Sequence, residues 1–247
     1  MKLICIFKNG LIGSGRLLPR DIRNYINSII PEKEKELKDF FAWHKKGESS
    51  PVIYQLPNRK SFAILSYKED SQAKKMFSEL IDLIKENRKL SFKKDNIKLE
   101  IENIKINDNF KYTNFEDGFT EKRIHSPLII ASSNQDYAKS RELSANDNID
   151  MKKLKTLAID AITQSIIKTH RDWFGKEIDE SIIDNLMIMF KNDLEYHVIK
   201  YKDNEYYPAI RGTIVCNMKL PDYLGYKIGL GYGELTNLKQ MQKRGLI

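Results

Sequence analysis

The stretch PVIYQLPNRKSFAILSYK, residues 51–68, decides the fold of the first half of this sequence. It holds two extended runs that are rich in β-branched and aromatic residues, and Asn58 and Arg59 separate them. This pattern predicts a β-hairpin. Within the second run, the residues FAIL at 62–65 place apolar side chains on both faces of the strand. A sheet that is apolar on both faces must be covered on both, so we expect helices on one face and a second domain or a ligand on the other.

The segments on both sides of the hairpin complete a β-α-β-β-α-β pattern. Apolar residues recur with the period of a strand or of a helix in each of them. They are a strand at 2–8, a helix from Pro19, a charged segment with an apolar side at 32–43, a helix capped by Asp70 or Ser71, and a strand at 97–104. This order is typical of a ferredoxin-like (RRM-like) domain, which we therefore predict over residues 1–110.

The remaining residues, 111–247, have a similar alternation of strands and helices. After a polar connector, we expect a strand that runs through Pro127 and a long helix from a cap near Asp150 to Gly175. The apolar stretch at 181–190 fits a helix or a strand, and the runs at 194–201 and 206–220 read as a hairpin. We predict a second ferredoxin-like domain with a glycine-rich C-terminal loop, and hence an α+β chain of two tandem ferredoxin-like domains.

Composition narrows the class of protein. The chain has 247 residues, of which 41% are hydrophobic and 31% charged, as in a globular protein. Cys5 and Cys216 are too few and too distant for a disulfide framework or a four-ligand zinc site. The N-terminal apolar run, residues 3–7, is shorter than a signal-peptide core. We therefore expect a cytoplasmic protein without membrane association, and we expect neither a structural metal nor a cofactor.

The charge balance favours a polyanionic partner. The chain carries 42 Lys and Arg against 34 Asp and Glu, a formal net charge of +8. Residues 1–110 hold 22 basic and 15 acidic side chains, and residues 200–247 hold 8 and 4, so the basic excess lies at both ends. A solvated surface of lysine-rich composition would give the same numbers.

Glycines concentrate near the C-terminus, where six of the twelve lie from Gly212 onward. Glycine permits positive φ and a close approach of main-chain N–H groups to phosphates. The candidate phosphate contacts here are Gly229, Gly231, Gly233, Lys227, Lys239, Lys243 and Arg244. The nucleotide motifs GxxxxGK[ST] and strand–GxGxxG–helix are missing, which argues against a nucleotide-binding enzyme. The GxSxG, HExxH and kinase motifs are missing too, which argues against a serine hydrolase, a metalloprotease and a protein kinase.

Two stretches resemble the CRISPR-associated endoribonucleases that cut precursor CRISPR RNA within each repeat, in particular the archaeal-type branch of this RAMP superfamily. Together they cover about a quarter of the chain. They are Trp43, His44, Pro51, Val52, Ile53, Tyr54 and Gln55, and Gly212, Thr213, Leu220, Pro221, Asp222, Tyr223, Leu224, Gly225, Arg244 and Gly245. The Tyr–Gln order and the end of the chain depart from the family pattern.

The resemblance implies a metal-independent cleavage of RNA. The 2′-hydroxyl attacks its own phosphodiester and leaves a 2′,3′-cyclic phosphate and a 5′-hydroxyl. Histidine suits the acid or base role because its pKa lies near neutrality. His44 is the candidate catalytic residue with Tyr54 as a hydrogen-bonding helper, and Lys45 and Lys46 are candidate phosphate contacts. His125 is a second candidate, whereas the positions of His170 and His197 favour structural roles.

Two alternatives to the enzyme stay open. One is a subunit of the same fold that holds repeat or guide RNA in a CRISPR effector complex without cutting it. The other is a general RRM-type RNA-binding protein, because residues 60–67 partly fit the RRM octamer, although Ser61 and Ile64 depart from it. The expected partners are precursor CRISPR RNA, other CRISPR-associated subunits and a second copy of the chain in a homodimer.

Overall fold

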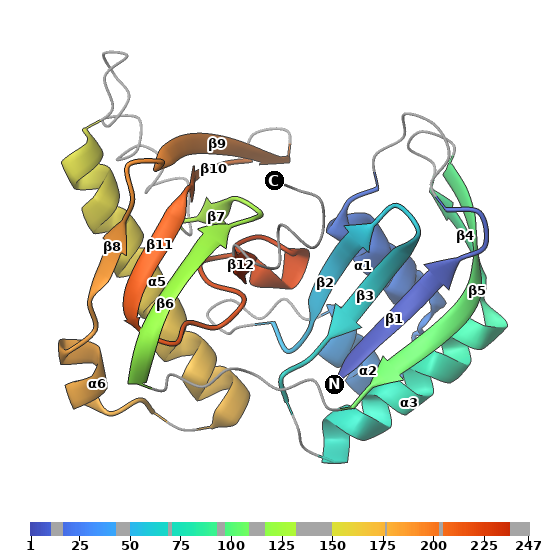
Figure 1. Cartoon of the computed structure of the whole chain (residues 1–247). Coiled ribbons are helices and arrows are strands. Elements are labelled where there is room, and N and C mark those ends of the chain that lie inside the picture. The colour runs from blue at the N-terminus through green and yellow to red at the C-terminus, as the bar shows by residue number, and fades with distance from the viewer. Residues whose placement is uncertain are drawn as a thin grey trace. The chain divides into compact units, whose positions relative to one another are not determined.

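The computed structural model describes residues 1–10, 17–42, 50–68, 71–92, 97–108, 117–131, 150–175, 177–202 and 205–237. The chain divides into two units (Figure 1). Unit 1 consists of Met1–Lys111 together with Gly229–Gly231, and unit 2 consists of Tyr112–Ile228 together with Tyr232–Ile247.

Unit 1 is an antiparallel sheet with helices on one face (Figure 1). Its elements are β1 (Lys2–Phe7), α1 (Pro19–Ile29), α2 (Lys35–Ala42), β2 (Ile53–Asn58), β3 (Ser61–Leu65), α3 (Ser71–Glu86), β4 (Lys89–Phe92) and β5 (Ile97–Asn107). The strand order is β2-β3-β1-β5-β4. The predicted hairpin is confirmed as β2 and β3, with Tyr54 opposite Ile64.

The core of unit 1 lies between the sheet and its helices. Alternate residues of β1 point into it, including Leu3 and Cys5, which are fully buried. Phe41 of α2 and Phe77 of α3 meet there edge to face, with ring centroids 5.4 Å apart. All five residues of β3 are buried, as its two apolar faces require.

Unit 2 repeats this plan with interruptions. Its elements are β6 (Asp117–Ile124), β7 (Leu128–Ile129), α5 (Met151–Phe174), α6 (Glu180–Asp184), β8 (Ile188–Phe190), β9 (Glu195–Lys202), β10 (Glu205–Arg211), β11 (Thr213–Met218), the 3₁₀ turn η2 (Ile228–Leu230) and β12 (Leu235–Asn237). One sheet has the order β12-β6-β11-β8, and a smaller one has the order β7-β10-β9. In chain order the larger sheet reads 4-1-3-2, and so do β5-β1-β3-β2 of unit 1. Each unit therefore has a ferredoxin-like sheet.

The second helix of the motif is replaced in unit 2. Between β11 and β12 the chain forms only η2 and the glycine-rich segment 219–234, all of which is described. The first helix, α5, has the predicted ends. The Asp150 side chain accepts hydrogen bonds from the amides of Lys152 and Lys153, and Gly175 closes the helix with φ 64°.

The structure corrects three expectations for unit 2 and resolves a fourth. The run at 206–220 is not one strand, because the strand breaks at Gly212, where φ is 136°: β10 forms the predicted hairpin with β9, and β11 pairs with β6 and β8 in the other sheet. The strand predicted through Pro127 is broken, because proline lacks the N–H that a strand ladder needs, so β6 ends at Ile124 and β7 begins at Leu128. β6 itself starts within the expected connector. The ambiguous stretch 181–190 contains both a helix, α6, and a strand, β8. Within the described ranges, no helix is long and apolar enough to span a bilayer.

Candidate nucleic-acid interface

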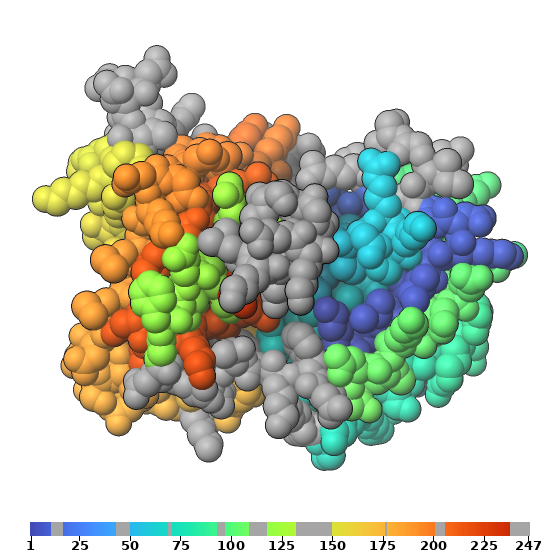
Figure 2. Space-filling view, in the orientation of Figure 1, coloured from blue at the N-terminus to red at the C-terminus, as the bar shows by residue number. Residues whose placement is uncertain are grey.

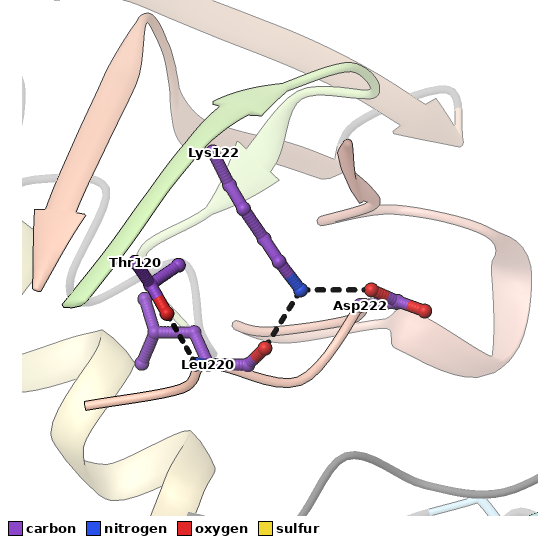
Figure 3. Close-up of polar contacts among 4 residues, drawn as sticks. All are labelled: Thr120, Lys122, Leu220 and Asp222. Carbon is purple, nitrogen blue, oxygen red and sulfur yellow. Dashed lines mark hydrogen bonds and ion pairs between the residues drawn. The ribbon is translucent and has the colours of Figure 1, made fainter. Parts of the chain in front are cut away.

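The glycine-rich segment is anchored at its start by a buried lysine of β6 (Figure 3). The Lys122 ammonium group donates a hydrogen bond to the Leu220 carbonyl over 2.7 Å and pairs with the Asp222 carboxylate over 2.8 Å. On the same strand, the Thr120 hydroxyl accepts a hydrogen bond from the Leu220 amide over 3.2 Å. Only 8% of the Lys122 side chain is exposed, so this cation belongs to the scaffold and is not a phosphate contact.

A serine of α5 holds the next turn of the segment. The Ser165 hydroxyl accepts a hydrogen bond from the Gly225 amide over 2.8 Å and donates one to the Gly225 carbonyl over 3.2 Å. Gly225 has φ 90°, and a Cβ atom there would lie 2.8 Å from the Ile129 carbonyl oxygen. Both the backbone angle and the lack of space therefore require glycine at this position.

Gly233 closes the segment against the break between β6 and β7. Its amide donates a hydrogen bond to the Pro127 carbonyl, and its carbonyl accepts one from the Leu224 amide, each over 3.0 Å. A Cβ atom on Gly233 would lie 1.7 Å from the Leu224 carbonyl oxygen. The predicted phosphate contact at Gly233 is therefore not available through its amide, because the protein already uses that donor.

Lys227 has an unusual backbone for a lysine. Its φ is 61°, in the left-handed region, where it is the single non-glycine among the residues the structure describes. Such a conformation costs about 1–2 kcal/mol. Its ammonium group lies 5.2 Å from the ring centroid of Tyr207, a cation–π contact that fixes the side chain. Strain of this kind is common at binding sites.

The tip of the segment, Gly229–Gly231, belongs to unit 1. A Cβ atom on Gly229 would lie 2.6 Å from the Ser50 side chain, and one on Gly231 would lie 2.8 Å from the Tyr54 carbonyl oxygen. The main chain of the tip thus lies directly against the residues that lead into β2. Two predicted site glycines and Tyr54 are brought together here.

Tyr54 is part of the core rather than of a surface. Its side chain is 1% exposed, and its hydroxyl donates a hydrogen bond to the Phe41 carbonyl over 2.8 Å. Burial raises the pKa of Tyr54 above its ordinary value, and the nearby Arg23 charge opposes this only weakly. The hydroxyl ties β2 to the last turn of α2, at Phe41–Ala42.

The predicted catalytic and phosphate-binding side chains flank these anchors in the sequence. His44, Lys45 and Lys46 fall in residues 43–49, and Lys243 and Arg244 fall in residues 238–247, both outside the described residues. The positions on both sides of 43–49 are fixed: Phe41 by the Tyr54 hydroxyl and Ser50 by its own hydrogen bond to the Val52 carbonyl over 2.7 Å.

The other three histidines lie at three different places in unit 2. The His125 amide donates to the Glu234 carbonyl over 2.7 Å, so this half-buried residue lies beside the return of the glycine-rich segment. His170 is in the last turns of α5, 5.5 Å from the Phe174 ring. His197 is in β9, 3.2 Å from the Glu195 carboxylate. The expected positions of His170 near a helix end and His197 in a sheet are confirmed.

The RRM alternative loses its stacking surface in unit 1. The two aromatic residues of the octamer-like stretch are both buried: Phe62 is fully buried in the core, and Tyr67 is 2% exposed. Neither ring can stack on a base. The stretch is a buried strand, which is the other interpretation of its composition.

Sequence reasoning missed two of the residues that fix the glycine-rich segment, Lys122 and Ser165. Lys122 is a charged residue within an alternating strand, a position usually exposed, and its partner is 100 residues away. Among the residues that the structure describes, no group of three or more His, Cys, Asp or Glu is placed to hold a metal ion.

Solved structures with the same fold exist, although no family model and no curated protein matches the sequence. A crystal structure of Cas6b has a TM-score of 0.62 at 16% identity and covers 96% of this chain and 100% of its own. A CRISPR RNA processing endoribonuclease Cas6b has a TM-score of 0.53 at 14% identity, with 95% and 97% covered. A RAMP protein binding different RNA substrates has a TM-score of 0.56 at 12% identity, with 96% and 98% covered.

These likenesses confirm the resemblance noted in the sequence at the level of fold. They extend over both units, well beyond the two stretches that carry the sequence resemblance. The strand order 4-1-3-2 in each unit agrees with them. The chain is an α+β protein of two tandem ferredoxin-like units, the fold of solved Cas6 and RAMP proteins.

Proposed function

We propose that the chain is an endoribonuclease that binds CRISPR repeat RNA and cleaves precursor CRISPR RNA in the cytoplasm, without a metal. Two solved structures of this fold are a CRISPR RNA processing endoribonuclease Cas6b and a RAMP protein that binds different RNA substrates. The net charge of +8 suits a polyanionic ligand. The product passes to other CRISPR-associated subunits.

One observation carries this proposal: the glycine tip lies against Ser50, the first described residue after the stretch that contains His44. Gly229 approaches Ser50 so closely that a Cβ atom would lie 2.6 Å away, and Ser50 directly follows residues 43–49. A phosphate bound at the tip would therefore lie near Ser50, which follows His44 by six positions in the sequence. Lys227, two residues before Gly229 in the sequence, supplies a positive charge. Its left-handed backbone and its contact with the Tyr207 ring hold its side chain in place.

The proposed chemistry divides the roles among these residues. His44 acts as the general acid or base on the 2′-hydroxyl or the leaving 5′-oxygen. Lys45, Lys46, Lys227, Lys243 and Arg244 contact phosphates and balance the charge that develops on the scissile group. Gly229 and Gly231 contact the RNA backbone through main-chain atoms on the side away from Ser50 and Tyr54, because their Cβ side already lies against these residues.

Tyr54 acts as a positioning residue in this scheme. Its hydroxyl is already bound to the Phe41 carbonyl and is buried, so it serves His44 by fixing the helix end three residues earlier in the chain. Gly233 likewise acts through the fold, because its hydrogen bonds hold the return of the segment.

The test is cleavage of labelled RNA that carries one CRISPR repeat of the host, in the presence of EDTA. We expect the wild type to cut at one position and to leave a 2′,3′-cyclic phosphate, and His44→Ala to bind the RNA with unchanged affinity but to cut at least 100-fold more slowly. His197→Ala is the matched control and should cut normally. His125→Ala tests the second candidate.

Three outcomes would reject the enzyme or its assignment. Tight binding of repeat RNA by the wild type without any cutting would favour the non-catalytic CRISPR subunit. Equal binding of repeat and scrambled RNA would favour a general RNA-binding protein. Normal cutting by His44→Ala together with loss in His125→Ala would move the acid or base to the second histidine.

A further inference from the structure

The sheet of unit 1 has an outer face, which is the face away from α1, α2 and α3. Leu99 and Ile101 of β5 pack into the core on the side of the helices. Because alternate residues of a strand point to opposite faces, Glu100 between them lies on the outer face. The space-filling view shows part of this face, with β1 (blue) between β3 (cyan) and β5 (green) (Figure 2).

Four segments of unit 1 lie side by side at the end of the sheet where β1 finishes. Lys8 follows β1, and its amide donates a hydrogen bond to the Glu100 carbonyl over 2.9 Å. Lys89 of β4 is paired with Glu100 from the other side. On the opposite edge of β1, the Phe7 amide donates to the Lys60 carbonyl over 2.8 Å. The turn between β2 and β3, the end of β1, β5 and the start of β4 thus bring their charged residues to one edge.

β5 carries two carboxylates near this edge, Glu100 and Glu102, and each has a cation beside it. The Lys8 ammonium group lies 3.7 Å from the Glu100 carboxylate, and both side chains are about half exposed. The Arg88 guanidinium group donates a hydrogen bond to the main-chain carbonyl of Glu102 over 3.3 Å, so its charge lies next to that residue. Glu86, a further carboxylate nearby in the sequence, ends α3 on the other face of the sheet. The two carboxylates of β5 are therefore matched by two cations.

Three further cations at this edge have no such partner. Arg59 and Lys60 of the turn and Lys89 of β4 are exposed, and within the described ranges their side chains form no hydrogen bond or ion pair. Residues 11–16, which follow Gly10 in the sequence, include one arginine and no carboxylate, so they bring no neutralising charge. We call Arg59, Lys60 and Lys89 the basic row. It gives this edge an excess of positive charge that complements a polyanion.

The turn that carries two cations of the basic row is held in shape. The Asn58 side-chain oxygen accepts hydrogen bonds from the Lys60 amide over 2.7 Å and from the Ser61 hydroxyl over 3.1 Å. Gly10 packs against the turn, and a Cβ atom on it would lie 3.3 Å from both the Arg59 carbonyl oxygen and the Lys60 Cγ atom. A backbone fixed before binding loses less conformational entropy when a ligand is bound.

The chemistry of this edge favours a nucleic-acid backbone over a protein partner. Asn9 and Asn58, which are also exposed here, are polar, whereas the centre of a protein interface is usually apolar. The basic row has no ring on which a base could stack. It spans three strand spacings of about 4.8 Å, or roughly 14 Å. At about 3.4 Å of axis per phosphate in one strand of a helix, this length matches about four phosphates.

We propose that the basic row binds the sugar-phosphate backbone of an RNA strand without reading its bases. The proposal rests on the proposed function in one respect, since it takes the polyanion to be RNA. The basic row begins one residue after the end of β2, whereas Tyr54, which contacts the glycine tip, lies at the start of that strand. The RNA would therefore contact unit 1 at a second place, at the other end of β2.

The test compares the wild type with the triple variant Arg59→Gln, Lys60→Gln, Lys89→Gln. Binding is measured by fluorescence anisotropy with two labelled RNAs, one CRISPR repeat of the host and a scrambled RNA of equal length. Each contact with a single-stranded phosphate contributes about 0.7 to the slope of log K against log salt concentration, or about fivefold in affinity between 1 M and 0.1 M salt. We expect the triple variant to lower this slope by about 2 for both RNAs, and to weaken binding of both by the same factor, about 100-fold at 0.1 M salt.

Two further variants test whether the position of the charge matters. The matched control Lys33→Gln, Lys35→Gln, Lys74→Gln removes the same net charge from exposed lysines of α2, α3 and the turn before α2, and it should bind both RNAs normally. Glu100→Gln removes the carboxylate that lies between Lys8 and Lys89, and it should tighten binding of both RNAs, by about fivefold at 0.1 M salt. Thermal unfolding of each variant verifies that the fold is intact.

Several results would overturn the proposal. Equal losses of affinity in the two triple variants would assign the effect to net charge alone. A loss for the repeat RNA but not for the scrambled RNA would mean that the basic row reads sequence. Unchanged affinity of the basic-row variant, with normal cutting by the wild type, would remove RNA from this edge and leave the proposed enzyme intact. The expected loss of affinity, with no cutting by the wild type, would reject the enzyme and keep the basic row.

Discussion

At the scale of single residues, Lys122 and Tyr54 act through partners far away in the sequence. Lys122 joins β6 to the start of the glycine-rich segment, and Tyr54 joins β2 to the end of α2. Both side chains are almost fully buried, so each polar group depends on its single set of protein partners. A substitution at Lys122 therefore tests the stability of unit 2, and one at Tyr54 tests the effect of a buried hydrogen bond on RNA cleavage.

Replacing Lys122 should destabilise unit 2. In Lys122→Met, the Leu220 carbonyl loses its donor and Asp222 loses its partner, which we expect to lower the free energy of unfolding by about 1–3 kcal/mol. Urea unfolding measures this loss. Lys200→Met is the control, since Lys200 of β9 is exposed and its removal should change stability by less than about 0.5 kcal/mol. Equal effects of the two substitutions would contradict the role assigned to Lys122.

Tyr54→Phe should slow RNA cleavage without shifting its pH profile. The variant loses the hydrogen bond to Phe41 and about 1 kcal/mol of stability. Since the pKa of Tyr54 is raised by burial, the group stays protonated through the neutral range in the wild type. We expect a lower single-turnover rate constant for cleavage with an unchanged affinity for the RNA, measured between pH 5 and pH 9.

Tyr25→Phe provides the matched control for Tyr54. The Tyr25 hydroxyl donates to the Asn87 carbonyl over 2.7 Å, and burial raises the pKa of Tyr25 as well. This variant should lose a similar amount of stability and cut RNA at the normal rate. A shifted pH profile in Tyr54→Phe would instead indicate that its hydroxyl takes part in proton transfer.

At the scale of elements, the turns of the glycine-rich segment depend on glycine for two reasons, backbone angle and space. Gly233 and Gly175 have φ values of 72° and 64°, but only at Gly233 would a Cβ atom collide with the backbone, at 1.7 Å from Leu224. We expect Gly175→Ala to cost about 1 kcal/mol from the angle alone, and Gly233→Ala to cost clearly more. Thermal unfolding compares the two, and a larger loss for Gly175→Ala would show that the collision relaxes.

The turn between β8 and β9 should contribute stability that depends on pH. Burial raises the pKa of the Asp193 carboxyl, but hydrogen bonds from the Thr213 hydroxyl and amide lower it by more, so the net shift is downward. A lowered pKa in the folded state gives stability that is present above the unfolded value of about 3.9 and is lost as the pH falls through the folded value. Asp193→Asn should therefore lower the urea midpoint at pH 7 and leave it nearly unchanged at pH 2.5. An equal loss at both pH values would rule out this linkage.

Elements with local signals could be predicted from the sequence, whereas elements fixed by distant partners could not. The ends of α5 follow from the cap at Asp150 and the glycine at 175. β4 is a short edge strand with two polar residues, and only its pairing with β5 identifies it. Phe119 sits in a stretch that reads as a connector, so its place on an inner strand depends on β11 and β12.

At the scale of the whole molecule, the tandem plan could be predicted because each unit follows a known order of strands and helices. The path of the glycine tip could not, since no local pattern says that residues 229–231 join the first unit. The same holds for the role of Tyr54, whose partner is known only once α2 is placed.

The proposed RNA contacts predict a change in salt dependence. Two phosphate contacts with a single strand contribute about 1.4 to the slope of log K against log salt concentration, at about 0.7 each. We expect the double variant Lys45→Ala, Lys46→Ala to reduce the slope of repeat-RNA binding by about this amount. The double variant Lys74→Ala, Lys75→Ala is the control, because it removes two adjacent exposed lysines of α3. Equal slopes in the two double variants would remove Lys45 and Lys46 from the interface.

The three residues that the C-terminal part of the chain contributes to unit 1 also set an order of events during synthesis. Unit 1 otherwise ends at Lys111, and Gly229 follows 118 positions later. At about 5–20 residues per second, the ribosome needs roughly 6–24 s to make that stretch. During this time the nascent N-terminal unit lacks three of its residues, so its folding can be completed only after Gly229–Gly231 have been synthesised.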